Sequence, residues 1–213
     1  MRELRLRIGF LSSYSGQELH LAVAEFSRTY PEVSIDIIGG THEELYRMLQ
    51  NGSIDMALND QRRAFSDKYE NFRLSSCACC IELSSSDPLA IPDRIDISQL
   101  QRKTCILVSP VQERKTEENY YQEILGYGSS YLFAENLPEA RLMTVGGRGF
   151  LPVDQVGTLP APEPGLVRRP VFRDSEQLRR SYCVFWKKKN SGYYIEEFAG
   201  MLRDLLSSER GQS

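Results

Sequence analysis

Two short polar segments of this sequence carry the residues best suited to bind a small anion. Ser12, Ser13 and Ser15 follow one apolar run of the chain, and Gly40 and Thr41 follow the next. Each segment precedes a predicted helix, so hydroxyl groups occur together with the backbone N–H groups of a helix N-terminus. Helix capping makes the same demands on these residues. The pattern therefore fits either a carboxylate-binding site or a pair of helix caps, and we keep both interpretations open.

A second group of candidate binding residues lies in the middle of the chain. Ser109, Pro110 and Val111 follow a predicted strand, and Gly147 and Arg148 lie in a glycine-rich turn. Ligands of open parallel sheets bind beyond the carboxyl ends of the strands, so we expect both turns to face a binding cleft. The guanidinium of Arg148 is a potential bidentate partner for a carboxylate. A solvated surface arginine is the more common arrangement.

The cysteines invite a metal or redox interpretation that the rest of the sequence does not favour. Cys77, Cys79 and Cys80 alternate along a predicted strand, and His20 and His42 are the only histidines. A structural zinc site needs four thiolate or imidazole ligands, so we expect no metal and no cofactor. Buried cysteines packed as small apolar residues are the simplest interpretation, and a redox switch is the alternative. No nucleophile elbow, phosphate-binding loop or metal-ligand helix occurs, so we expect no enzyme activity.

These candidate residues are positioned by an alternation of strands and helices in the first part of the chain. Strands are predicted at 4–10, 33–38 and 54–58 from their apolar, β-branched composition. The helices between them begin at two segments with capping-box spacing, Ser15-Gly16-Gln17-Glu18 and Thr41-His42-Glu43-Glu44. Two consecutive strand–helix–strand units with short connections imply right-handed crossovers and a parallel sheet.

The second part of the chain continues the α/β pattern with less regular spacing. Further strands are predicted at 72–83, 104–108, 131–134, 166–172 and 182–186, and helices at 116–125, after Asn136 and at 195–206. The proline-rich segment 152–170 is predicted to be mostly loop before its last strand. The fold class is therefore α/β, with two successive α/β units.

Composition limits the classes of protein to which this chain can belong. With 213 residues, 41% hydrophobic and 26% charged, it can bury one sizeable core or two small ones. The net charge of -3 and the lack of a basic run longer than residues 187–189 argue against DNA binding by this chain alone. No signal peptide or membrane span is recognisable, and the odd number of cysteines fits a reducing compartment. We therefore expect a cytoplasmic protein without membrane contact.

Several short motifs occur in a definite order along nearly the whole chain. They are Leu6-Arg7-Ile8-Gly9, Tyr30-Pro31 with Val33, Gly40-Thr41 with Glu44 and Leu45, Gly52 with Ile54-Asp55-Met56-Ala57-Leu58, Asp87-Pro88-Leu89-Ala90, and the segment from Val145 to Pro152. In this order and spacing they resemble the effector-binding domain of the LysR-type transcriptional regulators. The chain departs from the family pattern at Asp87, where histidine is usual, and at Arg148, in a shortened glycine-rich segment where a small apolar residue is common.

This resemblance implies a fold that resembles type 2 periplasmic binding proteins. Two Rossmann-like lobes would enclose a cleft and would be joined by two crossover strands. Residues 1–76 with 182–213 would form lobe I, and residues 77–181 would form lobe II. The resemblance also implies that Ser12, Ser13 and Thr41 contact the effector. The family's winged helix-turn-helix would precede Met1, so we expect DNA binding only through an N-terminal domain that this chain lacks.

The same resemblance implies two kinds of partner. The first is a small-molecule effector, for which a carboxylate or another anion suits the polar turns; its binding would change the lobe or subunit arrangement and so control transcription. The second is another copy of the chain, in a dimer or tetramer that uses exposed apolar residues around Val23, Tyr30 and Ile37. Three alternatives remain: a free-standing solute-binding protein of a transport system, an enzyme on the same fold, and a redox-sensing regulator domain that uses its cysteines.

Overall fold

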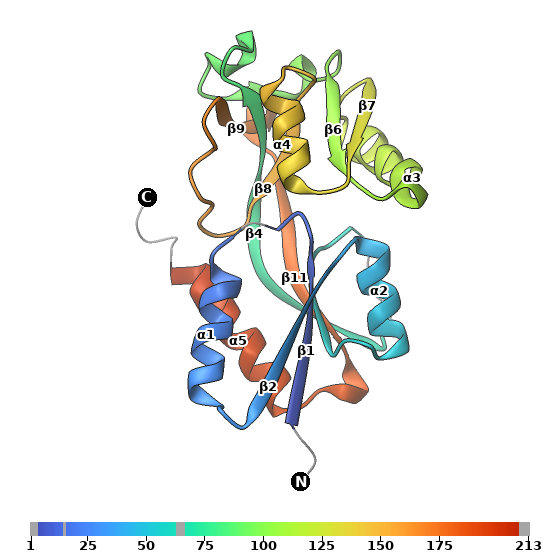
Figure 1. Cartoon of the computed structure of the whole chain (residues 1–213), viewed down its shortest axis with the longest axis vertical. Helices are drawn as coiled ribbons and strands as arrows, with labels where there is room; N and C mark the ends of the chain where they lie inside the picture. Colours follow the sequence, from blue (N-terminus) through green and yellow to red (C-terminus); the bar gives the residue numbers. More distant parts are fainter. Residues whose placement is uncertain (1–3, 15, 63–66, 209–213) are drawn as a thin grey trace. The chain divides into compact units, whose positions relative to one another are not determined.

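The computed structural model describes residues 4–14, 16–62 and 67–208 and divides into two compact units (Figure 1). Unit 1 comprises Met1–Cys77, Val156–Pro160 and Arg180–Ser213, and unit 2 comprises Ala78–Gln155 and Ala161–Arg179. The lobes expected from the sequence change at 76/77 and 181/182, and the two compact units change at 77/78 and 179/180. The segment 156–160 also belongs to unit 1.

Unit 1 is built on a sheet whose first three strands are parallel. Its central strand β1 (Leu4–Leu11) pairs with β2 (Val33–Gly40) on one side and with β3 (Met56–Asp60) on the other. The helices are α1 (Glu18–Thr29), α2 (His42–Asn51) and α5 (Tyr193–Ser208), with the 3-10 turn η5 (Lys188–Asn190) before the last. In the register Leu11 faces Gly40, and Phe10 faces Leu58. The carboxyl ends of all three strands therefore meet at one edge of the sheet.

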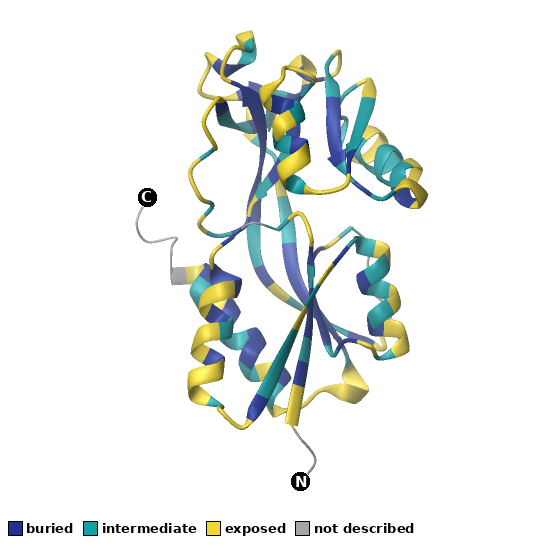
Figure 2. Cartoon of the chain, in the orientation of Figure 1, coloured by how far each residue is buried: buried dark blue, intermediate teal, exposed yellow. Residues whose placement is uncertain are grey.

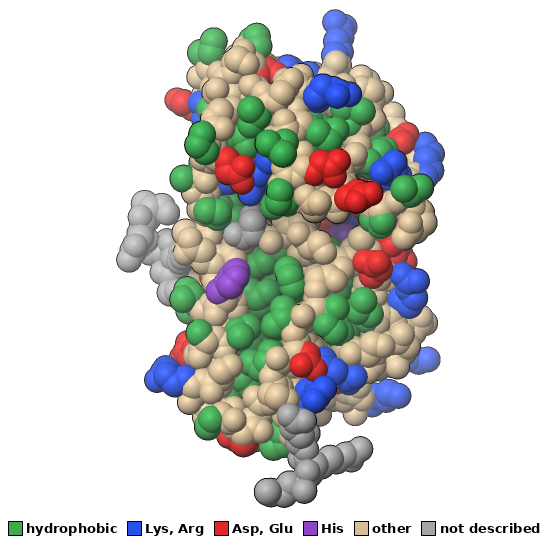
Figure 3. Space-filling view, in the orientation of Figure 1, with side chains coloured by type: hydrophobic (Ala, Val, Ile, Leu, Met, Phe, Trp, Pro, Cys, Tyr) green, Lys and Arg blue, Asp and Glu red, His purple; other side chains and the backbone are tan. Residues whose placement is uncertain are grey.

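The helices of unit 1 are amphipathic, as their apolar spacing predicts. Figure 2 shows buried residues on the sides of α1 and α5 that face each other and exposed residues on the outer side of α1. Two large apolar side chains on α1 and β2 nevertheless remain exposed, Leu21 at 52% and Ile37 at 42%. Figure 3 shows hydrophobic side chains gathered on the part of unit 1 where α1 and β2 lie.

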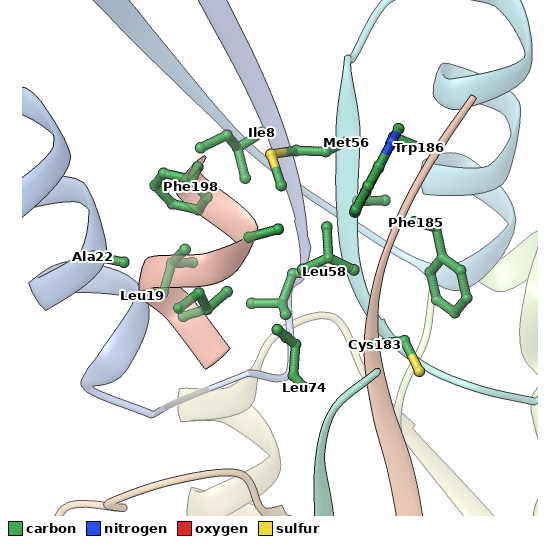
Figure 4. Packing of buried hydrophobic residues seen from close by; sticks show 14 of the residues in the cluster. Ile8, Leu19, Ala22, Met56, Leu58, Leu74, Cys183, Phe185, Trp186 and Phe198 are labelled. Atoms are coloured by element: carbon green, nitrogen blue, oxygen red, sulfur yellow. The ribbon is translucent and has the colours of Figure 1, made fainter. Parts of the chain in front are cut away.

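The core of unit 1 lies between its sheet and the pair α1 and α5. Ile8, Met56 and Leu58 point from the strands towards Leu19 of α1 and Phe198 of α5 (Figure 4). The two helices contact each other through edge-to-face aromatic packing, with the ring centroids of Phe26 and Phe198 5.6 Å apart. Leu45 and Leu49, on the inner face of α2, are also fully buried in this core.

Two long strands include the points where the chain passes between the units. They are β4 (Tyr69–Ser84) and β11 (Arg179–Lys187), and β11 pairs antiparallel with β3, with Tyr182 opposite Asp60. These are the two predicted crossover strands. The segment 156–160 adds a further excursion of the chain into unit 1.

Unit 2 combines a mixed sheet with short helices. The strands β8 (Leu151–Gln155) and β9 (Leu166–Arg173) both pair antiparallel with β4, and β6 (Thr104–Val108) pairs parallel with β7 (Ser130–Ala134). The remaining elements are η1 (Pro88–Ala90), β5 (Ile95–Asp96), η2 (Ile97–Gln99), η3 (Val111–Glu113), α3 (Arg114–Asn119), the π-helix η4 (Tyr120–Leu125), α4 (Leu137–Val145) and β10 (Glu176–Gln177). Fully buried side chains at the centre of this unit include Ile81, Leu83 and Phe150.

Two local predictions were wrong. The first helix does not begin with a capping box: its N-cap is Gln17, without a side-chain cap hydrogen bond, and Glu18 bonds a distant segment instead. Ser15, the predicted cap, lies outside the described residues. The segment predicted as loop from Pro152 contains β8, because pairing with β4 places Pro152 opposite Ile81 despite its missing N–H donor. Tertiary pairing overrides the local proline signal there.

None of the helices in the described part of the chain combines the length and the apolar composition needed to cross a membrane.

Candidate functional site

The two polar loops of unit 1 lie side by side. The backbone N–H of Ser12 donates to the carbonyl oxygen of Gly40 at 3.0 Å, which joins the loop after β1 to the loop after β2. The side chains of Ser12 and Ser13 are exposed at this edge, whereas Gly40 is buried. A Cβ atom on Gly39 would lie 3.2 Å from the hydroxyl oxygen of Ser12, so a glycine there lets the two loops approach closely. Hydroxyl groups and the start of α2 therefore occupy one surface.

Thr41 is a helix cap, as one of the two interpretations required. Its hydroxyl oxygen accepts a hydrogen bond from the N–H of Glu44 at 3.3 Å, and the Glu44 carboxylate accepts from the N–H of Thr41 at 2.9 Å. This reciprocal capping box begins α2, whose other end is closed by Gly52 in the left-handed conformation. A hydroxyl group that accepts one bond still has a proton to donate. Capping and anion binding are therefore compatible at Thr41.

A buried charged group at the same edge escaped the sequence analysis. Asp60 is the last residue of β3, and its side chain is only 1% exposed. It forms an ion pair with Arg180 of β11 and contacts His42 of α2, and Nε of Arg62 lies 3.3 Å from its carboxylate. We call these four residues the Asp60 cluster. Two guanidinium groups and an imidazole thus surround one carboxylate beside the start of α2.

The fold explains how residues far apart in the sequence come to form this cluster. Asp60 ends β3 at the edge where β1 and β2 also end, and β11 runs antiparallel beside β3, which brings Arg180 alongside. His42 is the first residue of α2, directly after the Thr41 cap. The polar pair Asn59 and Asp60 at the end of an apolar strand is a sequence signal of the same kind as Ser12 and Thr41. Arg180 carries no such signal, because only the strand pairing reveals its neighbour.

Burial sets the electrostatic character of the Asp60 cluster. Arg180 is almost fully enclosed, and this burial lowers its pKa to about 10, so the guanidinium stays protonated at neutral pH. The side-chain oxygen of Asn59 is also buried and makes no hydrogen bond to any described residue. Guanidinium groups held rigidly in a partly dry site form strong, paired hydrogen bonds with carboxylates. The arrangement is chemically suited to an anion.

The candidate residues of unit 2 separate into two groups that the fold does not bring together. Ser109 is buried at the carboxyl end of β6, where its N–H donates to Ala134 at 3.0 Å; Pro110 is half-buried and Val111 is exposed. The turn with Gly147 and Arg148 lies at the opposite end of β6, because the N–H of Phe150 donates to Thr104 at 3.0 Å.

This separation corrects the prediction that both turns face the same site. The helix α4 runs back along β6, so the turn that follows α4 arrives at the amino end of that strand. Arg148 is exposed there. At the carboxyl end of β6, the N–H of Ser109 donates to Ala134, and the guanidinium of Arg114 lies 5.2 Å from the ring centroid of the adjacent Phe133 of β7. Nothing in the spacing of the sequence distinguished Arg114 from other arginines.

The cysteines have the properties of core residues. All five are buried and none forms a disulfide. Burial raises the pKa of Cys80 and Cys183 to about 11 and the pKa of Cys105 well above its usual value. These three thiols are therefore protonated at neutral pH, which disfavours attack on an oxidant. Within the described ranges no cluster of residues could hold a metal ion.

Comparison with known proteins gives one family and a set of solved structures with the same fold. The LysR substrate binding domain model matches residues 2–207, and no curated protein matches the chain. The reduced form of the OxyR regulatory domain from Pseudomonas aeruginosa is 16% identical, with a TM-score of 0.74, and the match covers 96% of this chain and 97% of that one.

Two further solved structures have similar values. The BenM effector binding domain with its effector benzoate is 15% identical, with a TM-score of 0.75, over 99% of this chain and 96% of that one. The regulatory domain of MetR from N. meningitidis is 16% identical, with a TM-score of 0.72, over 94% and 93% of the two chains. This chain therefore belongs to the family of LysR substrate-binding domains, the effector-binding parts of transcription regulators, and has their two-lobed, type 2 periplasmic-binding-protein-like fold.

Proposed function

We propose that this chain senses a small anionic effector, most simply a carboxylate, at the carboxyl edge of the unit 1 sheet. Ser12, Ser13 and Thr41 would supply hydroxyl groups, and Arg180 would supply the charged contact. Binding would change the arrangement of the lobes or of the subunits and so control DNA binding by a full-length regulator. Family membership supports the sensing role, and the Asp60 cluster supports the anionic class of effector.

The observation that carries this proposal is the position of Arg180. It is a buried cation within the Asp60 cluster, at the edge where the Ser12 loop and the Thr41 cap meet. A carboxylate at this edge would also benefit from the N-terminus of α2, a helix of 10 residues, through its N–H groups and its dipole. The hydroxyl groups, the guanidinium and the helix N-terminus would all stabilise the negative charge of the bound carboxylate.

Arg180 also suggests how ligand binding could act on the rest of the chain. It lies on β11, where the chain re-enters unit 1 from unit 2. A ligand that holds the Arg180 side chain therefore acts on the crossover strand itself. In unit 2, Ser109, Pro110 and Arg114 follow the carboxyl end of β6. Arg148 is left out of the proposed site.

A thermal-shift screen with matched ligand pairs tests the proposal. Benzoate, aliphatic dicarboxylates and amino acids are each compared with the corresponding neutral amide. At 100 times its Kd a ligand stabilises the folded state by about 2.7 kcal/mol, which raises the Tm by several degrees in a domain of this size. We expect at least one carboxylate, and not its amide, to raise the Tm. Shifts of equal size with amide and carboxylate, or no shift with any ligand, would contradict the anionic assignment.

The variant Arg180→Met, with Arg179→Met as its control, connects any shift to the proposed site. Arg179 is exposed and hydrogen-bonds Gln177, so its loss removes one positive charge from the same strand. We expect Arg180→Met to abolish the carboxylate-dependent shift and Arg179→Met to retain it. Equal Tm shifts in both variants would show that the carboxylate binds at a site without Arg180.

The transport alternative is separated from the regulator by the codons upstream of this chain. A regulator requires about 90 residues of helix-turn-helix and linker there, whereas an exported solute-binding protein requires a signal peptide or a lipid anchor. The redox alternative receives no support from the buried, protonated thiols of Cys80, Cys105 and Cys183.

A further inference from the structure

The connection between β8 and β9 leaves unit 2 and returns to it. Its residues Val156–Pro160 belong to unit 1, although the residues on both sides belong to unit 2. Val156 is buried in the core of unit 1. Residues 156–160 therefore pack with unit 1, although in the sequence they lie between two strands of unit 2.

A buried carboxylate holds the segment in place. Glu18, the first residue of α1, is only 1% exposed. Its carboxylate accepts a hydrogen bond from the N–H of Thr158 at 2.6 Å and from the hydroxyl of Tyr14 at 3.3 Å. The N–H of Gln17 donates to the carbonyl oxygen of Thr158 at 3.3 Å, which closes the arrangement from the other side. We call Tyr14, Glu18 and Thr158 the Glu18 clip.

Two glycines show that the approach of the two segments is as close as backbone allows. Gly157 has a φ of +69°, and a Cβ atom on it would lie 2.1 Å from the carboxyl carbon of Glu18. A Cβ atom on Gly16 would lie 2.5 Å from the carbonyl oxygen of Val156. Any larger residue at either position would force the segments apart. The segment 156–160 is therefore fitted to the start of α1.

Tyr14 connects the Glu18 clip to the loop that carries Ser12 and Ser13. Its ring stacks on that of Tyr182, with centroids 5.9 Å apart, and Tyr182 lies two positions after Arg180 on β11. Tyr14 therefore contacts both Glu18 and β11, the strand that carries the proposed anion-binding residue Arg180.

We propose that Glu18 is a positioning residue that couples the segment 156–160 to the Ser12–Tyr14 loop. Glu18 is hydrogen-bonded to both Thr158 and Tyr14, so a displacement of the segment 156–160 displaces the Ser12–Tyr14 loop as well. The coupling itself can be measured without a ligand; only its meaning for effector sensing rests on the proposed function.

Amide hydrogen exchange of the ligand-free chain tests this coupling. Because the clip bond to Thr158 is made to a carboxylate, Glu18→Ala should accelerate exchange at Thr158 about tenfold or more, and exchange in residues 12–14 should rise with it. Glu18→Gln keeps an acceptor oxygen and should restore much of the protection. Amides in β2 and α5 should be unchanged in both variants.

A second pair of variants tests the Glu18 clip by changing Thr158. Thr158→Pro removes the donating N–H, whereas Thr158→Ala keeps it. We expect faster exchange in residues 12–14 for the proline variant and unchanged exchange for the alanine variant. The proposal is overturned if exchange in residues 12–14 stays unchanged when the Thr158 bond is lost. It is equally overturned if exchange rises uniformly through β2 and α5, since that indicates a general loss of stability. Neither result depends on whether a carboxylate binds.

Discussion

At the residue scale, the buried carboxylates of Glu18, Asp60 and Glu82 differ in the groups that contact them. Glu82 of β4 is fully buried between Arg141 and Arg168, at 2.9 and 2.7 Å from their nearest nitrogens. Asp60 has arginine and histidine partners, while Glu18 is held by an N–H group and a hydroxyl. Burial tends to lower the pKa of Arg141, but hydrogen bonding and attraction from Glu82 outweigh it and raise that pKa above its usual value. These contacts predict different costs of removal.

Loss of the Glu82 carboxylate should be strongly destabilising. Glu82→Ala leaves two partly buried guanidinium groups without this carboxylate, and removal of one member of a buried ion pair typically costs about 3–5 kcal/mol. Glu163→Ala is the control, because Glu163 is largely exposed and lies 3.4 Å from Arg141. We expect the control to cost less than about 1 kcal/mol. Urea unfolding measures the loss of free energy of unfolding in both variants. Equal losses would show that burial does not increase the contribution of Glu82 to stability.

The raised thiol pKa values predict a loss of stability at alkaline pH. Burial raises the pKa of Cys80 from 9.0 to about 11, so the folded state binds this proton more tightly than the unfolded state. The resulting stabilisation is complete below about pH 9 and is lost as the pH rises towards 11. Between about pH 8 and pH 10.5, the wild-type chain should therefore lose more free energy of unfolding than Cys80→Ala. Parallel losses in the two proteins would mean that this thiol titrates normally.

At the element scale, the sequence predicts regular structure well and long-range contacts poorly. The side-chain caps at Thr41 and Asn136 act within one helical turn, so α2 and α4 begin where the sequence predicts. The strand β8 was missed because its pairing with β4 is not local. For the same reason the sequence indicated the Ser12 and Thr41 loops but gave no sign that Arg180 would join them.

The two roles of Thr41 can be separated by comparing two helix caps. Thr41→Ala and Asn136→Ala each remove a side-chain cap, at the start of α2 and of α4 respectively. Each should reduce stability by about 1 kcal/mol. Only Thr41→Ala should also reduce the Tm shift produced by an active carboxylate, because Asn136 is not part of the proposed site. If both variants bind the carboxylate as the wild type does, Thr41 is a cap and nothing more.

At the scale of the whole molecule, the exposed apolar side chains predict self-association. LysR regulator domains oligomerise, and here Leu21 and Ile37 are exposed on neighbouring elements of unit 1. Of the three residues predicted around this surface, Val23 and Tyr30 are partly buried, and Tyr30 also bonds Tyr193 and Glu197. We therefore propose Leu21 and Ile37 as the centre of the contact.

Sedimentation velocity with charged variants tests this surface. Leu21→Glu and Ile37→Glu should shift the chain towards monomer, since each would place a charge in an apolar contact. Ile91→Glu is the control, because Ile91 is 84% exposed but belongs to unit 2, whereas α1 and β2 belong to unit 1. A wild-type chain that is monomeric at high concentration would refute the predicted association.

The most direct test of the central claim is a crystal structure of the chain with the carboxylate that gives the largest Tm shift. We expect the ligand's carboxylate oxygens at hydrogen-bond distance, about 2.7–3.0 Å, from the Arg180 guanidinium and the Thr41 hydroxyl. The Ser12–Tyr14 loop should border the same ligand. A carboxylate bound without contact to Arg180, Thr41 or this loop would contradict the account of the anion site.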